Sequence, residues 1–398
     1  MKFTDVETFV VGNPPPGYGG RYFVFVKLST DTGATGWGEV YSPPFSPDTV
    51  AALVADVFDR RVKGTDPFRI EERTRLLYSL GFTQRPDVTI GGIISAFDMA
   101  SWDIVGKETN RNVTDLLGGI VRERVRGYTY IYPSPGADDS VYTDPDLAAE
   151  RAVDYVEAGH TAIKFDPAGP YRAVGPRQPS MNELDRSEAF MRQIREAVGT
   201  RADLLFGTHG QFTPSGAIRL AQRLEPWSPL WFEEPCPPDI PEAMADVARH
   251  TSIPVATGER LTSIVEFQRL LVTGSASILQ PNLARAGGIT AGKKIAAIAE
   301  TFGAQVAPHL YCGPIAGAAN LAVAATIPNF LVLEGIEQWG GFHAELLTNP
   351  VRWDSGYVVP FTEPGLGTEI DEAVAKANPW TGDGLHLSVT TDVDDWPG

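Results

Sequence analysis

Seven short apolar segments of this chain each lead into a polar or ionisable residue, and their spacing restricts the possible fold more than any other feature. The seven residues are Lys164, His209, Glu233, Glu259, Asn282, His309 and Glu334. After a first step of 45 positions, the later steps all measure between 23 and 27 positions, which leaves room for a helix between successive strands. The pattern predicts a (β/α)₈-type barrel, whose strands would place these residues at one mouth.

The residues before this series follow a different pattern. Residues 22–28 and 36–41 are rich in β-forming side chains and flank a turn-rich stretch, which predicts a β-hairpin. Between residues 47 and 119, apolar side chains recur at intervals of three and four, as they do in helices. The first third of the chain is therefore expected to form an α+β domain.

The length of 398 residues accommodates both parts, because a barrel takes roughly 250 residues. We predict an α/β protein with three segments. Residues 1–121 form an α+β capping domain with lid loops, and residues 122–345 form the barrel. Residues 346–398 form a C-terminal segment that packs back on the capping domain. A hairpin and loop are expected at residues 357–370 of this segment.

Charge and cysteine content limit the classes of partner. The formal net charge of −17 argues against nucleic acid, which requires a basic surface. Two cysteines exclude a disulfide framework and suit a reducing cytoplasm. We see neither a signal peptide nor a membrane span, so we expect a cytoplasmic protein. The negative charge would also repel an anionic substrate, which a bound cation would help to offset.

Glu233 and Glu259 follow adjacent strands of the predicted barrel. Two carboxylates on one rim are costly unless positive charge lies between them, and a hard divalent cation such as Mg²⁺ prefers oxygen ligands. The alternative is that both are solvated loop acids, or ion-pair partners of Arg260 or Arg285.

Lys164 and His309 lie on strands that are about two-fifths of the barrel circuit apart. Taken singly, each is more often structural, as an ion-pair lysine or a hydrogen-bonded core histidine. Together, over a metal, they indicate an acid and a base. A free lysine titrates near 10.4, so a basic role requires burial or a neighbouring cation to lower its pKa.

Several motifs, in this order, carry a family resemblance. They are Thr-Gly-Trp-Gly-Glu at 35–39, Ser-Ala-Phe-Asp-Met-Ala-Ser-Trp-Asp-Ile-Val-Gly-Lys at 95–107, Leu-Leu-Gly-Gly at 116–119, Phe-Glu-Glu-Pro at 232–235, Thr-Gly-Glu at 257–259, Gln-Pro-Asn-Leu-Ala-Arg-Ala-Gly-Gly at 280–288 and Pro-Gly-Leu-Gly at 364–367. The chain resembles the enolase superfamily, specifically its mandelate racemase-like branch that acts on acid sugars. The resemblance covers nearly the whole chain.

The resemblance implies abstraction of the proton α to a carboxylate, giving an enediolate stabilised by Mg²⁺. It implies that Glu233 and Glu259 bind the metal and that Lys164 is the base on the second strand. His309 would be the opposing acid or base, and Glu334 a hydrogen-bonding acid on the last strand.

The chain departs from the family pattern at three positions. Gly207 stands where relatives have a metal-binding carboxylate, so His209 is the candidate third ligand, with Asp166 as runner-up. An imidazole ligand would make Mn²⁺ possible beside Mg²⁺. Asn282 replaces the aspartate that often pairs with the catalytic histidine, which favours a neutral or acid-donating role for His309 over that of a strong base. Asp166 also occupies the second position of what is often a Lys-x-Lys pair.

These departures favour β-elimination, which needs one base and one acid, over racemisation, which needs two bases. We expect a sugar-acid dehydratase, or a cycloisomerase that opens an internal ether or lactone. A racemase or epimerase of a 2-hydroxy acid and an inactive metal-binding barrel are the alternatives. Loops 13–21 and 41–46 would act as lids. Tyr130 and Tyr132 on the first barrel strand are candidates to contact the acid sugar, with core packing as the alternative. From the resemblance we also expect a homo-oligomer.

Overall fold

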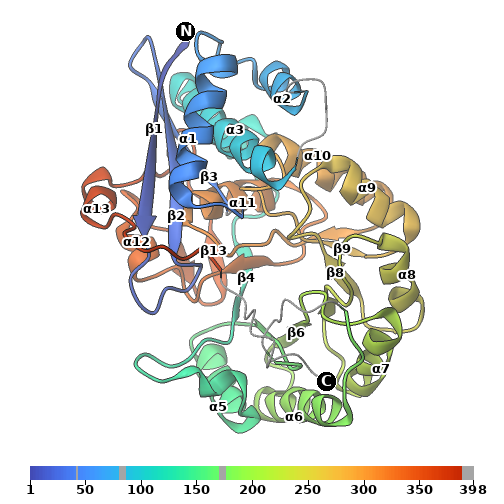
Figure 1. Ribbon diagram of the computed structural model, residues 1–398. Coiled ribbons are helices and arrows are strands. Elements are labelled where there is room, and N and C mark those ends of the chain that lie inside the picture. Colours follow the sequence, from blue (N-terminus) through green and yellow to red (C-terminus); the bar gives the residue numbers. More distant parts are fainter. Residues whose placement is uncertain (42–43, 80–86, 170–175, 388–398) are drawn as a thin grey trace.

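The computed structural model describes residues 1–41, 44–79, 87–169 and 176–387. Its N-terminal part opens with a three-stranded antiparallel sheet of β1 (Phe3–Gly12), β2 (Tyr22–Thr30) and β3 (Thr35–Val40), shown in blue in Figure 1. Strands β2 and β3 form the hairpin that the sequence predicted. Residues 42–43 of the predicted second lid loop lie outside the described residues.

Helices pack against this sheet, as the apolar spacing predicted. They are α1 (Pro47–Val57), the π-helix η1 (Phe58–Val62), α2 (Ile70–Tyr78), α3 (Val88–Thr109) and the short α4 (Val113–Leu116). By length and hydropathy α3 alone among the described helices resembles a membrane span. Because 78% of its most apolar window is buried inside the protein, α3 has the surroundings of a core helix.

The Thr-Gly-Trp-Gly-Glu motif joins three parts of the protein at β3. A Cβ at Gly36 would lie 2.1 Å from the Ala100 carbonyl oxygen, and one at Gly38 would lie 1.9 Å from the Ala96 carbonyl oxygen, so only glycine allows α3 this close. Glu39 is fully buried and accepts hydrogen bonds from backbone amides at the N-terminus of helix α11 (Pro314–Thr326), including that of Ala316 at 2.9 Å. The motif therefore fixes the capping domain to the rest of the molecule.

Eight parallel strands form the predicted barrel, to the right and below in Figure 1. They are β4 (Val125–Tyr130), β5 (Ala162–Phe165), β6 (Asp203–Gly207), β7 (Trp231–Glu233), β8 (Val255–Thr257), β9 (Ile278–Leu279), β10 (Gln305–Val306) and β11 (Leu333–Gly335). Each of β4 to β9 pairs with the next strand in the chain. Pairing of β11 with β4 and a bridge between Val306 and Phe330 close the circuit.

Seven longer helices connect these strands. They are α5 (Pro145–Glu157), α6 (Met181–Val198), α7 (Pro214–Leu224), α8 (Pro241–Arg249), α9 (Ile264–Thr273), α10 (Gly288–Thr301) and α11, with the 3₁₀ turns η2 (Asp139–Tyr142) and η3 (Glu225–Trp227). The four-residue α12 (Phe342–Glu345) comes directly after β11. Their ends follow the local sequence: Thr213 caps α7 with Pro214 at its first position, and Ser263 caps α9, which ends at left-handed Gly274.

The C-terminal segment returns to both parts of the molecule. A hairpin of β12 (Arg352–Asp354) and β13 (Tyr357–Val359) pairs with the start of β4, so the hairpin expected at 357–370 begins earlier than predicted. Helix α13 (Glu372–Ala377) then lies beside β1. The predicted fold class is confirmed, whereas the domain boundaries remain predictions. Residues 388–398 lie outside the described residues.

A buried histidine just before β5, His160, should make the stability of the protein depend on pH. The His160 ring is 1% exposed and packs on Trp353, with 4.4 Å between ring centroids. Burial, with a smaller contribution from Arg151, lowers the pKa of His160 from 6.5 to about 4. Between about pH 4 and pH 6.5, His160 binds a proton in the unfolded chain but not in the folded protein. The resulting stability is present above about pH 6.5 and is lost as the pH falls toward 4.

We therefore expect acidification from pH 7.5 to pH 5 to reduce the free energy of unfolding by about 2 kcal/mol more in the wild type than in His160→Phe. Urea denaturation followed by tryptophan fluorescence at both pH values measures this difference. Equal losses in the two proteins would contradict the assignment.

Candidate active site

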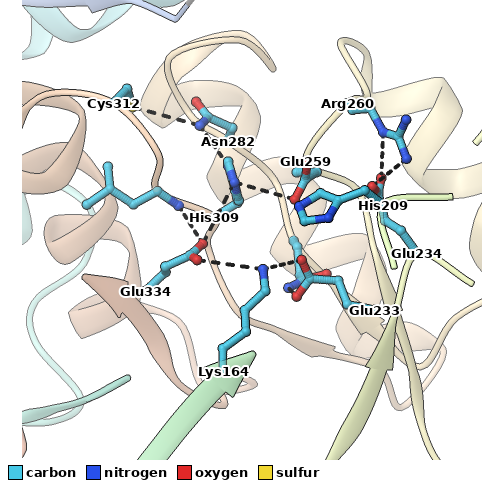
Figure 2. A network of polar contacts seen from close by, with 12 residues as sticks. Lys164, His209, Glu233, Glu234, Glu259, Arg260, Asn282, His309, Cys312 and Glu334 are labelled. Carbon is cyan, nitrogen blue, oxygen red and sulfur yellow. Dashed lines mark hydrogen bonds and ion pairs between the residues drawn. The ribbon is translucent and has the colours of Figure 1, made fainter. Parts of the chain in front are cut away.

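The C-terminal ends of the barrel strands open into a cavity of about 630 Å³. Seven of the nine residues predicted for the site line it: Tyr130, Lys164, Asp166, His209, Glu259, His309 and Glu334. Glu233 and Asn282 lie behind this lining, fully buried, in contact with Lys164 and His309 (Figure 2). All nine predicted residues therefore meet at one mouth, and together they come from all eight strands or the turns that follow them.

Lys164 points from β5 into a group of buried carboxylates (Figure 2). Its ammonium contacts Glu233 and lies 3.8 Å from Glu334 Oε1. Gln280 Nε2 donates to the other oxygen of Glu233 at 2.7 Å. Burial alone lowers the pKa of Lys164, but the Glu233 and Glu334 carboxylates raise that pKa well above its usual value. The lysine holds its proton here, so a basic role requires this negative charge to be offset.

Asn282 determines which ring nitrogen of His309 carries a proton. Its Oδ1 accepts the backbone N–H of Ala284 at 2.9 Å, which leaves Nδ2 facing His309 Nδ1 at 3.0 Å. Because an amide nitrogen only donates, Nδ1 of His309 is the unprotonated acceptor. The proton of the neutral ring therefore lies on Nε2. An aspartate at position 282 would accept from Nδ1 and favour the other tautomer.

The Nε2 atom of His309 faces the cavity and its acids. It lies 3.4 Å from Glu259 Oε2 and 3.9 Å from Glu334 Oε2. Asn320 Nδ2 donates to the His309 carbonyl oxygen at 3.0 Å, and the Leu310 N–H donates to Glu334 Oε2 at 2.8 Å. These contacts hold the imidazole in place as a hydrogen-bond donor toward the cavity, in agreement with the acid-donating role expected from Asn282.

His209 and Asp166 form a second pair in the same cavity. Nδ1 of His209 lies 3.1 Å from Asp166 Oδ2, and the left-handed φ of 48° at His209 is a conformation that often occurs at functional sites. Burial alone lowers the pKa of His209, but Asp166 raises it to about 10. Metal ligation needs an unprotonated ring nitrogen, so this pair competes with the metal-binding role predicted for His209.

Gly207 stands where the family pattern has a metal-binding carboxylate, and it lies beside Oδ1 of Asp166. A Cβ at Gly207 would be 3.1 Å from Asp166 Oδ1 and 3.5 Å from the Cβ of Glu233. Asp166 therefore presents a carboxylate oxygen next to the place where a side chain at position 207 would begin.

The chemistry of these donors fits a hard divalent cation. Glu233, Glu259 and Asp166 offer carboxylate oxygens, and Asp166 Oδ1 and Glu259 Oε2 are buried atoms without a hydrogen-bond donor among the described residues. Across the described ranges, no three histidine, cysteine or carboxylate side chains are already arranged as a metal-binding group. The donor types thus suit Mg²⁺ or Mn²⁺, and side-chain rotation is needed to bring them onto one ion.

The alternative of solvated loop acids is wrong for both metal candidates, because Glu233 is 1% and Glu259 9% exposed. Arg260 pairs instead with Glu234, at 3.1 and 2.6 Å. Arg285 donates to the carbonyl oxygen of Glu259 at 3.1 Å. Among the described residues Glu233 pairs instead with Lys164, and Glu259 lies 3.4 Å from His309, so the ion-pair form of the alternative is met by other partners.

Apart from Tyr130 and Tyr132, sequence reasoning did not name the aromatic wall of the cavity. Its further lining residues include Tyr41, Tyr132, Tyr142, Tyr311 and Leu387. Tyr132 follows the first barrel strand and Tyr311 follows His309 by two positions, so strand-end reasoning offered a signal for both. Leu387 comes from the C-terminal segment, for which the strand repeat gives no signal.

Comparisons with known proteins cover both parts of the chain. Residues 18–118 match the mandelate racemase / muconate lactonizing enzyme N-terminal domain, and residues 147–374 match the enolase C-terminal domain-like family. D-galactonate dehydratase of Ralstonia pickettii (strain 12J) is 35% identical over 387 residues, covering 94% of this chain and 93% of that protein.

Solved structures agree. A mandelate racemase/muconate lactonizing enzyme-like protein from Roseovarius sp. TM1035 is 53% identical, with a TM-score of 0.95 and 98% of each chain covered. One from Jannaschia sp. CCS1 is 50% identical, with a TM-score of 0.94, covering 98% of this chain and 100% of that chain. The similarity to a dehydratase supports the predicted lyase class. The chain therefore belongs to the mandelate racemase-like branch of the enolase superfamily.

Proposed function

We propose that the protein is a metal-dependent acid-sugar dehydratase, which removes the proton α to a carboxylate and then eliminates water. One observation carries the proposal: Lys164 and His309 approach one carboxylate, Glu334, from different strands, while Asn282 keeps His309 as a donor. One base and one donor suffice for β-elimination, whereas racemisation needs two effective bases. The similarity to D-galactonate dehydratase supports a sugar acid as substrate.

In this mechanism Lys164 Nζ takes the α-proton, and the leaving hydroxyl takes the Nε2 proton of His309 and departs as water. The α-proton then passes from Lys164 to His309, which restores both groups. Glu334 lies between the two and hydrogen-bonds the substrate, with Asp166 and Tyr130 as further contacts. Hydroxide is a poor leaving group at neutral pH, so the proton from His309, which lets the hydroxyl depart as water, lowers the barrier to elimination. Opening of an internal ether or lactone would use the same groups, and a cycloisomerase is thus part of the same proposal.

Glu233, Glu259 and a third donor, Asp166 or His209, would hold Mg²⁺ or Mn²⁺. When bound, the cation supplies positive charge that offsets the carboxylates around Lys164 and stabilises the dianionic transition state. The proposal places the enzyme in the cytoplasm as a homo-oligomer, in line with the sequence expectations.

A library of acid sugars in deuterated solvent, with and without Mg²⁺, tests this function by NMR. We expect Mg²⁺-dependent exchange of the α-proton and accumulation of a 2-keto-3-deoxy acid from at least one compound. Exchange with inversion but without that product would indicate a racemase. The absence of exchange for every compound would indicate the inactive metal-binding barrel.

The third metal donor can be tested separately. We expect Asp166→Asn to weaken Mg²⁺ binding by about tenfold or more, and more than His209→Ala does, because the pair favours a protonated His209. From the sequence, His209 was the first candidate for the third ligand and Asp166 the second; this expectation reverses that order. Calorimetric titration of both variants with Mg²⁺ and with Mn²⁺ measures the difference. A larger loss of affinity in His209→Ala would restore the histidine as the ligand.

A further inference from the structure

The C-terminal arm, residues 379–387, crosses the capping domain and ends at the catalytic cavity. At its start, Pro379 forms an antiparallel bridge with Val11, and the Trp380 N–H donates to the Val10 carbonyl oxygen at 3.1 Å. At its end, the His386 carbonyl oxygen accepts the N–H of Arg21 at 3.3 Å. Arg21 is the last residue of lid loop 13–21, so the arm and the lid loop are joined.

The His386 side chain fills the space between the lid loop and the barrel mouth. It is 3% exposed, with its ring centroid 5.3 Å from that of Tyr41 and 6.2 Å from that of Tyr311. A Cβ at Gly20, whose φ is 108°, would lie 1.9 Å from His386 Nε2, so the contact with the lid loop leaves no room for a side chain. Burial lowers the pKa of His386 to about 3, and the ring is neutral at physiological pH.

Two cavities flank the tip of the arm. The catalytic cavity of about 630 Å³ lies on one side. The other, of about 410 Å³, is lined by the lid loop, Trp380 and His386. Tyr311 and Leu387 line both cavities. Leu387 is 53% exposed although it belongs to both linings, so its apolar surface faces open space rather than packed protein.

We infer that Tyr311 and Leu387 form a partition that sets the length of the acid accepted by the catalytic cavity, and that the C-terminal arm thereby determines specificity. The inference rests on the proposed function for the class of substrate. It assigns to the arm a contact with substrate that neither the strand repeat nor the family motifs include.

The chemistry of the partition explains the limit on length. Leu387 has no hydrogen-bonding atom in its side chain. Hydroxyl groups of an acid that lay against Leu387 would give up hydrogen bonds to water without gaining one from this side chain, which is unfavourable. A shorter acid would end before this surface, where tyrosine hydroxyls and the charged residues of the mouth can still bind it.

Two substitutions at Leu387 test the partition in opposite directions. Leu387→Gly should join the two cavities, and Leu387→Trp should narrow the passage between them. Leu385→Ala is the matched control, because Leu385 lies in the same arm, is 40% exposed and is absent from both linings. Six-carbon aldonic acids and aldobionic acids, which carry a second sugar ring, serve as short and long probes.

We expect the wild type and Leu385→Ala to prefer the short acid to a similar degree. In Leu387→Gly the ratio of kcat/KM for the short acid to that for the long acid should fall by about tenfold, because the KM of the long acid decreases. In Leu387→Trp the same ratio should rise. A preference within about twofold of the wild type in both Leu387 variants would overturn the inference.

Calorimetric binding of the same acids separates this inference from the proposed function. A wild type that neither exchanges the α-proton nor dehydrates any six-carbon acid contradicts the function. The relative affinity of each variant for long and short acids still decides the partition: a change in the stated directions supports it, and unchanged relative affinity rejects it.

Discussion

Lys164→Met should abolish exchange of the substrate α-proton and reduce kcat by roughly 100- to 10,000-fold, the range typical of a lost general base. The side chain points at Glu233 and Glu334, and the Met side chain has no group that accepts a proton. Solvent deuterium exchange measured by NMR reports this step without depending on elimination. Retained exchange in the variant would assign proton abstraction to another group.

The loss of a buried cation can itself destabilise the site, so a second variant is needed. Lys164→Arg keeps a positive charge beside Glu233 but cannot lose its proton. We expect the thermal unfolding midpoint of Lys164→Arg to lie closer to that of the wild type than the midpoint of Lys164→Met does. Lys164→Arg should still lack exchange of the substrate α-proton. Lys293→Met is the control for lysine removal, because Lys293 is bonded to the Thr326 carbonyl oxygen, away from the cavity lining. It should leave exchange unchanged.

Glu233→Gln should reduce the affinity for Mg²⁺ by more than the 10- to 100-fold that is typical for loss of an outer hydrogen-bonding partner. The change removes the negative charge and one of the two oxygens that accept from Lys164 and Gln280. Calorimetric titration with Mg²⁺ measures the affinity, and dehydratase activity should fall in parallel.

The neighbouring glutamate provides a matched control. Glu234 is as deeply buried as Glu233, but it pairs with Arg260. We therefore expect Glu234→Gln to keep a Mg²⁺ affinity within a few-fold of the wild type. Equal losses in the two variants would mean that general destabilisation of the mouth, rather than removal of a ligand, lowers the affinity.

Strand-end positions could be predicted from the sequence because the repeat itself encodes them. Parallel strands joined by helices bring their C-terminal ends together, so the order of residues along the chain becomes an order around one mouth. That is why residues as distant as Tyr130 and Glu334 were placed together correctly. The roles assigned to them remain proposals, since they depend on protonation and on metal binding.

Orientation within the site could not be predicted in the same way. Glu233 and Glu234 are chemically identical neighbours, yet Glu233 meets Lys164, whereas Glu234, with its left-handed φ of 43°, meets Arg260. Similarly, the effect of Asn282 on His309 depends on the Ala284 N–H that fixes the amide.

The wall of the cavity was hidden for another reason. Tyr41 belongs to the capping domain and Leu387 to the C-terminal arm, and both reach the mouth through contacts between segments far apart in sequence. No periodicity links such segments. The hairpin of β12 and β13 was misplaced for a related reason, because its position is set by pairing with β4 rather than by local residues alone.

Glu39 has a consequence for engineering by domain exchange. Its buried carboxylate, on a strand of the N-terminal sheet, completes the first turn of a helix that belongs to the barrel. A chimera that grafts a foreign N-terminal unit onto this barrel would leave those amides without an acceptor unless the donor brings an equivalent acid. Successful recombination between relatives therefore depends on transferring this one side chain as well as the lid loops.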